Sequence, residues 1–160
     1  AIRTGFHQIF LLHGVTASGK TQVYMEAAAE CLSQGKSAII LVPEIGLTNQ
    51  LIQRFAGRFG KEQIAIMHSK LTPRERYDEW QRMRQGKARI VIGARMGVFA
   101  PLSDIGLIVL DEEHEATYKS DMTPKYDTVE VAAKRLQYAG GVMILGSATP
   151  SVTSYERCRE

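Results

Sequence analysis

A phosphate-binding loop is the clearest chemical motif in the chain. It occupies residues 14–21 and reads Gly14-Val15-Thr16-Ala17-Ser18-Gly19-Lys20-Thr21. Gly14 and Gly19 can adopt a positive φ without a Cβ clash, so the N–H groups of the loop, including those of Thr16, Ala17 and Ser18, can turn toward phosphate oxygens. Lys20 then reaches the β- and γ-phosphates, and Thr21 offers its hydroxyl to Mg²⁺ at the start of a helix. The loop predicts that the chain binds a nucleoside triphosphate with Mg²⁺.

An acidic cluster supplies the partner that such a loop needs. It follows an apolar run and reads Asp111-Glu112-Glu113-His114. Asp111 is placed to hold Mg²⁺ directly or through water, and Glu112 to accept a proton from the water that attacks the γ-phosphate. The alternative is a solvated helix start, where the helix dipole stabilises carboxylates. The phosphate-binding loop favours the catalytic interpretation.

Two hydroxyl residues follow the last apolar run, in the segment Gly146-Ser147-Ala148-Thr149-Pro150. If the last strand lies beside the strand that carries Asp111, Ser147 and Thr149 could bond the acidic motif and sense the γ-phosphate. A capping turn before a helix at Ser151 is the ordinary alternative, because Ser and Thr favour such positions.

The elements that must position these groups alternate along the chain, which predicts an α/β fold with a mostly parallel sheet and helices on both faces. Strands are expected at 8–12, 37–42, 63–67, 88–93, 105–111 and 142–145, and helices at 21–33, 47–59, from 72 onward and at 128–138. Ligands of such sheets bind at the carboxyl ends of the strands, where all three motifs lie.

The helix that begins at residue 72 has a capping signal. Thr72, Pro73 and Glu75 stand at the N-cap, first-turn and capping-box positions. Tyr77, Trp80 and Met83 follow at i, i+3 and i+6, which predicts that Trp80 packs in the core and does not stack on a base. The helical arginines are expected on solvated faces: Arg54, Arg58, Arg74, Arg82 and Arg84.

Composition limits the function classes. The 160 residues are 44% hydrophobic, which suits one domain with a substantial core, and the net charge of +3 supports only local contact with nucleic acid. Cys31 and Cys158 lack CxxC spacing, which argues against zinc and favours buried or incidental thiols. No apolar run approaches the roughly 20 residues that span a bilayer, and no signal peptide is evident. A cytoplasmic protein without a membrane partner is expected.

The motifs, in this order, resemble a superfamily 2 helicase motor and within it the PriA family of replication-restart helicases. The segments that carry the resemblance are Gly14-Val15-Thr16, Val23-Tyr24, Leu41-Val42-Pro43-Glu44-Ile45, Phe99-Ala100-Pro101-Leu102, Asp111-Glu112-Glu113-His114, Tyr118-Lys119 and Gly146-Ser147-Ala148-Thr149-Pro150-Ser151. The resemblance implies a RecA-like P-loop NTPase lobe of an ATP-dependent 3′ to 5′ DNA helicase. It also implies roles for His114, Ser147 and Thr149 in coupling ATP hydrolysis to movement, and replication-restart proteins as possible partners.

Residues that would contact DNA follow from the same resemblance. A motor on single-stranded or forked DNA grips the sugar-phosphate backbone through amides, hydroxyls and a few cations. Pro43 and Thr48 end one strand and begin a helix, and Arg95 follows another strand, with a surface salt bridge as its alternative. The polar loop at 116–126 is similar to the family's aromatic-rich loop, and its candidates are Tyr118, Lys119, Lys125 and Tyr126. Tyrosines that cover a core edge are the alternative there.

The chain departs from the family pattern at several positions, and other functions stay open. Ala17 replaces a frequent Gly and Gln22 a frequent Glu, while Gly93-Ala94-Arg95-Met96-Gly97 lacks one or two hydroxyls of the proposed DNA face. Superfamily 2 motors place ATP between two similar lobes, so residues 1–160 are expected to form a single helicase ATP-binding domain within a longer chain, with poor hydrolysis alone. The alternatives are a RecG-like or restriction-type translocase, a P-loop kinase or other NTPase that ignores nucleic acid, and a non-catalytic binding lobe.

Overall fold

The sheet is fully parallel among the residues that the structure describes. The structure is a computed structural model, and it describes residues 7–14, 19–113, 118–119, 123 and 125–147. Within these ranges the strands are β1 (Gln8–His13), β2 (Ser37–Leu41), β3 (Ile64–Met67), β4 (Ile90–Gly93), β5 (Ile105–Leu110) and β6 (Val142–Ser147). Their order across the sheet is β1-β6-β5-β2-β4-β3.

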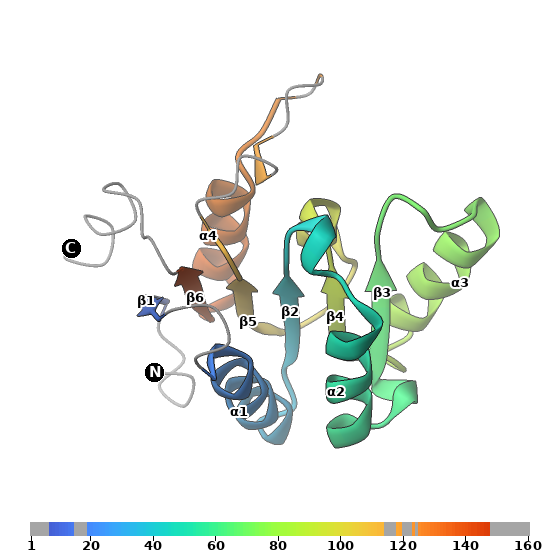
Figure 1. The fold of residues 1–160 in the computed structure, drawn as a ribbon, viewed down its shortest axis with the longest axis horizontal. Coiled ribbons are helices and arrows are strands. Elements are labelled where there is room, and N and C mark those ends of the chain that lie inside the picture. Colours follow the sequence, from blue (N-terminus) through green and yellow to red (C-terminus); the bar gives the residue numbers. More distant parts are fainter. Residues whose placement is uncertain (1–6, 15–18, 114–117, 120–122, 124, 148–160) are drawn as a thin grey trace.

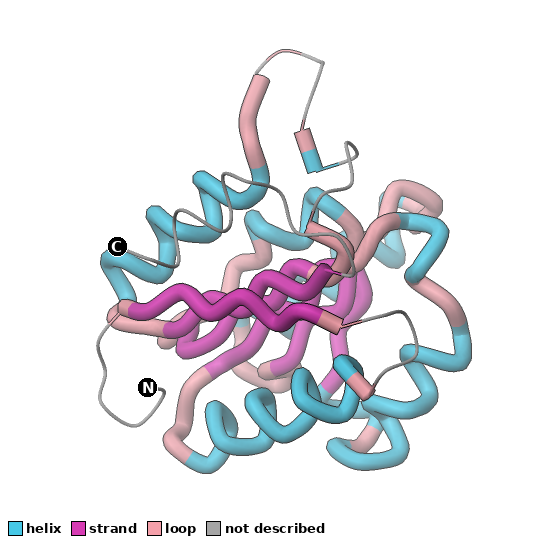
Figure 2. Tube along the Cα trace, turned by 60° about the vertical axis from the view of Figure 1, so that its left-hand side comes forward, coloured by secondary structure: helices cyan, strands magenta, loops and turns pink. Residues whose placement is uncertain are grey.

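Helices cover both faces of the sheet (Figures 1 and 2). They are α1 (Lys20–Ser33), α2 (Asn49–Phe59), α3 (Pro73–Arg84) and α4 (Thr128–Ala139), with short 3₁₀ helices η2 (Glu44–Gly46), η3 (Lys61–Gln63) and η4 (Arg95–Phe99). Side chains of α1 and α2 join one core cluster, and those of α3 and α4 join another. The predicted fold class is confirmed.

The strands divide their side chains between these two clusters. Ile39 and Leu41 of β2 pack on the side of α4, whereas Ala38 and Ile40 pack on the side of α1. Every residue of β2, β4, β5 and β6 is buried. A strand buried on both faces reads as a continuous apolar run, which is why the runs were visible in the sequence.

Backbone hydrogen bonds join neighbouring strands where they end. In each, the N–H of a residue at the start of a loop donates to a carbonyl at the end of the adjacent strand. The bonds are Gly14 to Ser147 at 3.1 Å, Glu113 to Gly146 at 3.0 Å, Asp111 to Leu41 at 2.8 Å, Val42 to Gly93 at 3.0 Å and Ala94 to Met67 at 3.0 Å. The loops that carry the motifs therefore start from one aligned edge.

Local signals in the sequence specify the helix ends. Thr72 and Glu75 form the predicted capping box of α3. Gly140 takes a positive φ of 74° and ends α4.

Cys31 is a buried thiol, as predicted, and its burial raises the pKa of the thiol to about 11. Cys158 lies outside the described residues.

The prediction that Trp80 packs in the core is wrong. Trp80 is 41% exposed and Tyr77 is 62% exposed, whereas Met83 is 2% exposed and is the one member of the triplet that joins the core. α3 packs beside β3, which is an edge strand, so only a narrow stripe of the helix meets the sheet.

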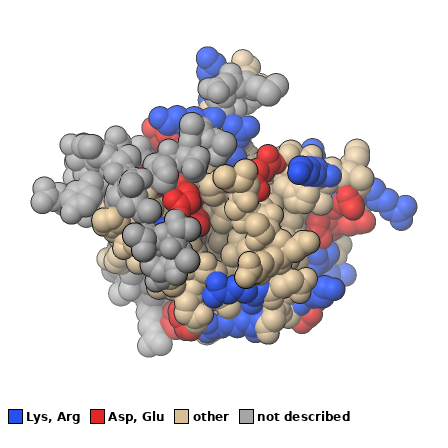
Figure 3. Space-filling view, viewed as in Figure 1, with Lys and Arg blue, Asp and Glu red and all other residues tan. Residues whose placement is uncertain are grey.

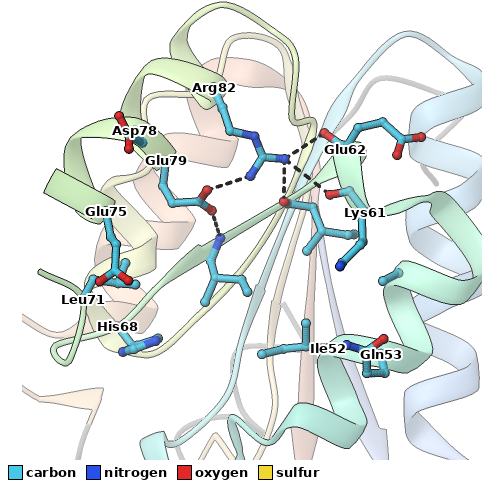
Figure 4. Close-up of a pocket in the computed structure, with 13 residues that line it drawn as sticks. Ile52, Gln53, Lys61, Glu62, His68, Leu71, Glu75, Asp78, Glu79 and Arg82 are labelled. Atoms are coloured by element: carbon cyan, nitrogen blue, oxygen red, sulfur yellow. Dashed lines mark hydrogen bonds and ion pairs between the residues drawn. The ribbon is translucent and has the colours of Figure 1, made fainter.

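Arg82 also departs from the expected solvated face, because it lies half-buried against the open edge of β3 (Figure 4). Its guanidinium donates to Glu79 at 2.6 Å and to the carbonyl of Ile64 at 2.9 Å. Glu79 in turn accepts from the N–H of Ile66 at 2.6 Å. The Glu79–Arg82 pair thus satisfies backbone groups that an edge strand would otherwise offer to another chain.

A cavity of about 690 Å³ lies beside this pair, between α2 and α3. Ile52, Ile64 and Ile66 supply apolar lining, and His68, Glu75 and Asp78 supply polar lining. None of the residues that line it belongs to the phosphate-binding loop or to the acidic cluster. Among the described residues, no helix is long and apolar enough to cross a membrane.

Because α3 has one buried side and one exposed side, a substitution on each side should change the free energy of unfolding by a different amount. Met83→Ala should lower the free energy of unfolding by about 2–5 kcal/mol, because it leaves a cavity in the core. Trp80→Ala should lower it by less, because Trp80 is already 41% exposed to water. Denaturant unfolding of both variants measures the difference, and a Trp80→Ala cost equal to that of Met83→Ala would contradict the observed packing of α3.

Candidate nucleotide site

Lys20 lies at the centre of the candidate site. It is the first residue of α1, and Gly19 before it takes a positive φ of 85° as the N-cap. The Lys20 side chain is 8% exposed. Its Nζ lies 3.1 Å from Oε1 of Glu112 and 3.8 Å from Oδ1 of Asp111. The structure thus joins the end of the phosphate-binding loop to the two carboxylates selected from the sequence.

The charges of this cluster explain how Lys20 can be buried. An ammonium removed from water is costly unless it is paired. Asp111 and Glu112 supply two negative charges and are themselves only 25% and 22% exposed. One ammonium between two carboxylates leaves one net negative charge, so the cluster has capacity for a further cation.

Glu112 has an unusual backbone. Its φ is 50°, in the left-handed region that non-glycine residues seldom adopt. Such a conformation costs about 1–3 kcal/mol and persists only where neighbouring contacts hold it. Here the N–H groups of Asp111 and Glu113, on either side, bond to the carbonyls of Leu41 and Gly146. The strained turn directs Glu112 toward Lys20.

Oxygen donors near Lys20 suit a magnesium ion. Asp111 contributes a carboxylate, and Thr21 is the second residue of α1, half-buried and adjacent in sequence to Lys20. Mg²⁺ prefers such oxygen ligands and keeps several waters. The donor set therefore fits the predicted ion. Thr16, Ala17 and Ser18 lie outside the described residues, as do His114 and Thr149.

Tyr24 is a site residue that sequence reasoning missed. It lies one helical turn after Lys20, is 2% exposed, and donates its hydroxyl to Oδ1 of Asp111 at 2.7 Å. Burial and the charge of Asp111 raise the pKa of this hydroxyl above its usual range, so the group stays a donor. The available signal was its spacing of four residues from Lys20 on one helix face.

Gly146 and Ser147 border the same carboxylate. β6 pairs with β5, as the prediction for Ser147 required, and Ser147 is buried at the end of β6. At Gly146, a Cβ atom would overlap the Tyr24 hydroxyl and lie 3.0 Å from Oδ1 of Asp111. A side chain at this position would thus displace the Tyr24–Asp111 contact.

The first two predicted DNA residues lie after β2. Pro43 is buried, and its carbonyl accepts from the N–H of Gly46 at 2.7 Å. Thr48 is exposed and caps α2 by accepting from the N–H of Leu51 at 3.2 Å. β2 pairs with β4, so the segments that follow these strands share one edge, as predicted.

Arg95 contacts the polar loop. Its Nη1 donates to the carbonyl of Lys119 at 2.9 Å. Its guanidinium also lies 5.8 Å from the ring centroid of Tyr126, which packs edge-on against Phe99 with ring centroids 5.0 Å apart. Lys119 and Lys125 are exposed. The guanidinium thus links η4 to the loop that carries the two lysines.

Tyr118 is enclosed, with 2% of its surface exposed. Its hydroxyl lies 2.5 Å from the carbonyl of Asp111 and 3.2 Å from that of Leu41. Thr128 donates to the Tyr118 carbonyl at 2.5 Å. The ring therefore covers a core edge, which is the alternative left open above, and its hydroxyl also ties the loop to the acidic motif.

The enclosed position of Tyr118 predicts a stability effect. Tyr118→Phe keeps the ring but removes the hydroxyl, so we expect the free energy of unfolding to fall by about 0.5–1.5 kcal/mol. Tyr138→Phe is the matched control, because Tyr138 is 88% exposed. Denaturant unfolding distinguishes them, and equal values for both variants would refute a structural role for the Tyr118 hydroxyl.

Comparison with known proteins shows which sequences this chain resembles. The chain is 49% identical over 154 residues to replication restart protein PriA of Bacillus subtilis, and the match covers 96% of this chain and 19% of that protein. The PriA protein of Synechocystis is also 49% identical, over 94% of this chain and 18% of its own length. The chain thus spans about a fifth of the length of these relatives. The predicted resemblance to PriA is confirmed.

Solved structures share the fold. The helicase domain of Pyrococcus furiosus Hef superimposes with a TM-score of 0.65 at 22% identity, over 96% of this chain and 32% of that one. RecG bound to a three-way DNA junction gives a TM-score of 0.64 at 25% identity, over 91% of this chain and 18% of that one. The sequence pattern of the DEAD/DEAH box helicases matches residues 2–158. The chain belongs to the DEAD/DEAH box helicase family.

Proposed function

We propose that this chain is the ATP-binding lobe of an ATP-dependent 3′ to 5′ DNA helicase that acts in replication restart and couples ATP hydrolysis to translocation on single-stranded DNA. The observation that carries the proposal is the buried Lys20 ammonium, 3.1 Å from Glu112 and 3.8 Å from Asp111. Family membership and similarity to PriA support the assignment of this cluster to a helicase motor.

The cluster suits ATP hydrolysis because the Lys20 ammonium can change its negatively charged partners. Phosphate oxygens can replace the carboxylates as partners of Lys20, which lies at the end of the phosphate-binding loop and at the N-terminus of α1. Glu112 is then released to take a proton from the attacking water. Asp111 and Thr21 would hold Mg²⁺, which would neutralise phosphate charge when bound.

A continuous set of contacts leads from the proposed DNA face to this cluster. Arg95 bonds to the carbonyl of Lys119, and the adjacent Tyr118 hydroxyl bonds to the carbonyl of Asp111. A backbone phosphate that attracts Arg95, Lys119 or Lys125 would therefore act on a loop tied to the acidic motif. Tyr126 offers a half-buried aromatic ring beside Arg95.

The charges on the visible face favour a few local contacts with the DNA backbone over binding by one broad basic surface. Figure 3 shows lysine and arginine side chains scattered with acidic ones over one face of the described residues. Contacts by Thr48, Arg95 and nearby amides suffice for a motor that does not read sequence. Single-stranded and forked DNA are the proposed substrates, and other replication-restart proteins the proposed partners.

Residues 1–160 are proposed to form one helicase ATP-binding domain of a two-lobed motor. The second lobe would supply an arginine that stabilises charge on the transferring phosphoryl group. A RecG-like translocase is the second candidate, because RecG bound to a three-way DNA junction shares the fold and is 25% identical over 91% of this chain.

ATPase assays of the full-length protein, with and without single-stranded DNA, test the proposal. We expect DNA to stimulate hydrolysis and Glu112→Gln to lower kcat by about 100-fold or more while ATP still binds, because a general base is lost. Glu62→Gln, an exposed residue of η3, serves as the matched control and should leave kcat unchanged.

Each failure has a separate meaning. Hydrolysis that ignores DNA would contradict the translocation proposal and favour an NTPase that does not act on nucleic acid. Full activity of Glu112→Gln would contradict the assignment of the catalytic base. Unwinding of branched junctions in preference to tailed forks would favour the RecG-like candidate.

A further inference from the structure

A buried tyrosine occupies an unexpected place beside the candidate site. Tyr24 follows Lys20 by four residues on α1, so both side chains lie on the face of the helix that meets the sheet. Its ring joins the core cluster between α1 and the sheet. Phenylalanine would fill the same space, so packing alone does not account for the hydroxyl.

The hydroxyl has a specific partner. A buried phenol loses its bonds to water, and the loss is costly unless another acceptor replaces them. Tyr24 finds that acceptor in Oδ1 of Asp111, at 2.7 Å. The contact crosses from α1 to the end of β5, and it ends on the carboxylate proposed to hold Mg²⁺.

The neighbouring glycine makes this contact possible. A Cβ atom at Gly146 would overlap the Tyr24 hydroxyl, and the ring carbon that bears the hydroxyl would lie 3.0 Å away. The hydroxyl therefore fills the space that the missing side chain leaves at the end of β6. Three elements, α1, β5 and β6, meet at a single hydrogen bond.

Because Tyr24 bonds to Asp111, each of the two carboxylates has its own nearest donor: Tyr24 for Asp111 and Lys20 for Glu112. Lys20 lies 3.1 Å from Glu112 but 3.8 Å from Oδ1 of Asp111, the oxygen that Tyr24 already engages. Lys20 and Tyr24 thus compete for one oxygen, and Tyr24 makes the shorter contact. Both described contacts of the Asp111 side chain fall on Oδ1.

We infer that Tyr24 is a positioning residue of the candidate ATPase site, whose hydroxyl fixes the Asp111 carboxylate so that Mg²⁺ binds together with the nucleotide. The inference rests on the proposed function. A hydrogen-bonding partner of a metal ligand typically contributes about tenfold to hundredfold to metal affinity. Without the hydroxyl, the carboxylate is free to turn toward Lys20.

Binding of a fluorescent ATP analogue to the full-length protein tests the inference, with measurements in Mg²⁺ and in EDTA. For Tyr24→Phe we expect affinity in EDTA to match the unsubstituted protein, while the gain in affinity from Mg²⁺ falls by about tenfold or more. The Mg²⁺ concentration that half-saturates ATP hydrolysis should rise in parallel. Tyr77→Phe is the matched control, since Tyr77 is 62% exposed on α3.

A second variant perturbs the same hydrogen bond from its other side. Gly146→Ala keeps the Tyr24 hydroxyl but displaces it, so the Mg²⁺-dependent gain should fall as in Tyr24→Phe. The double variant should then lose little more than either single variant, because both remove one interaction. Thermal unfolding of each variant confirms that the comparison concerns folded protein.

The outcomes separate this inference from the proposed function. An unchanged Mg²⁺-dependent gain in Tyr24→Phe would overturn the positioning role while leaving the proposed function intact. Equal losses in Mg²⁺ and in EDTA, or additive losses in the double variant, would also overturn it and assign Tyr24 to packing. If the unsubstituted protein binds no nucleotide, the proposed function fails, and the inference fails with it.

Discussion

The parallel register of the sheet, joined by hydrogen bonds where the strands end, is the constraint from which the candidate site follows. Loops begin against the last carbonyl of a neighbouring strand, as with Asp111 against Leu41 and Gly14 against Ser147. Such a sheet brings the loops after its strands to one edge, where α/β proteins bind ligands. Lys20, Asp111 and Gly146 are far apart in the chain, yet they meet at this edge.

A buried lysine then determines the electrostatics of that edge. Lys20 is paired mainly with Glu112, and Tyr24 holds the carboxylate of Asp111. The proposed nucleotide would bring phosphate oxygens to Lys20, and Mg²⁺ held near Asp111 would offset part of the negative charge that the phosphates add. Because Tyr118 bonds to the backbone of Asp111 and precedes the Lys119 carbonyl that Arg95 holds, the same edge also connects to the proposed DNA face.

Much of this architecture could be predicted from the sequence because it depends on local pattern. Strands buried on both faces are continuous apolar runs, and the caps at Thr72 and Gly140 depend on neighbouring residues alone. The proximity of Lys20 to Asp111 and Glu112 was expected because a phosphate-binding loop needs an acidic partner and because both motifs follow strands of a parallel sheet. By contrast, Trp80 was misassigned because helical spacing cannot reveal that α3 packs beside an edge strand. The roles of Arg82 and Tyr24 depend on which backbone or carboxylate lies opposite, which no local pattern specifies.

The most direct test of the account is a structure of the full-length protein with Mg²⁺ and a non-hydrolysable ATP analogue. The account predicts that Lys20 leaves Glu112 for phosphate oxygens, that Mg²⁺ binds between the nucleotide and Asp111, and that the Tyr24 hydroxyl still contacts that carboxylate. A nucleotide bound elsewhere, with the Lys20–Glu112 pair intact, would contradict it.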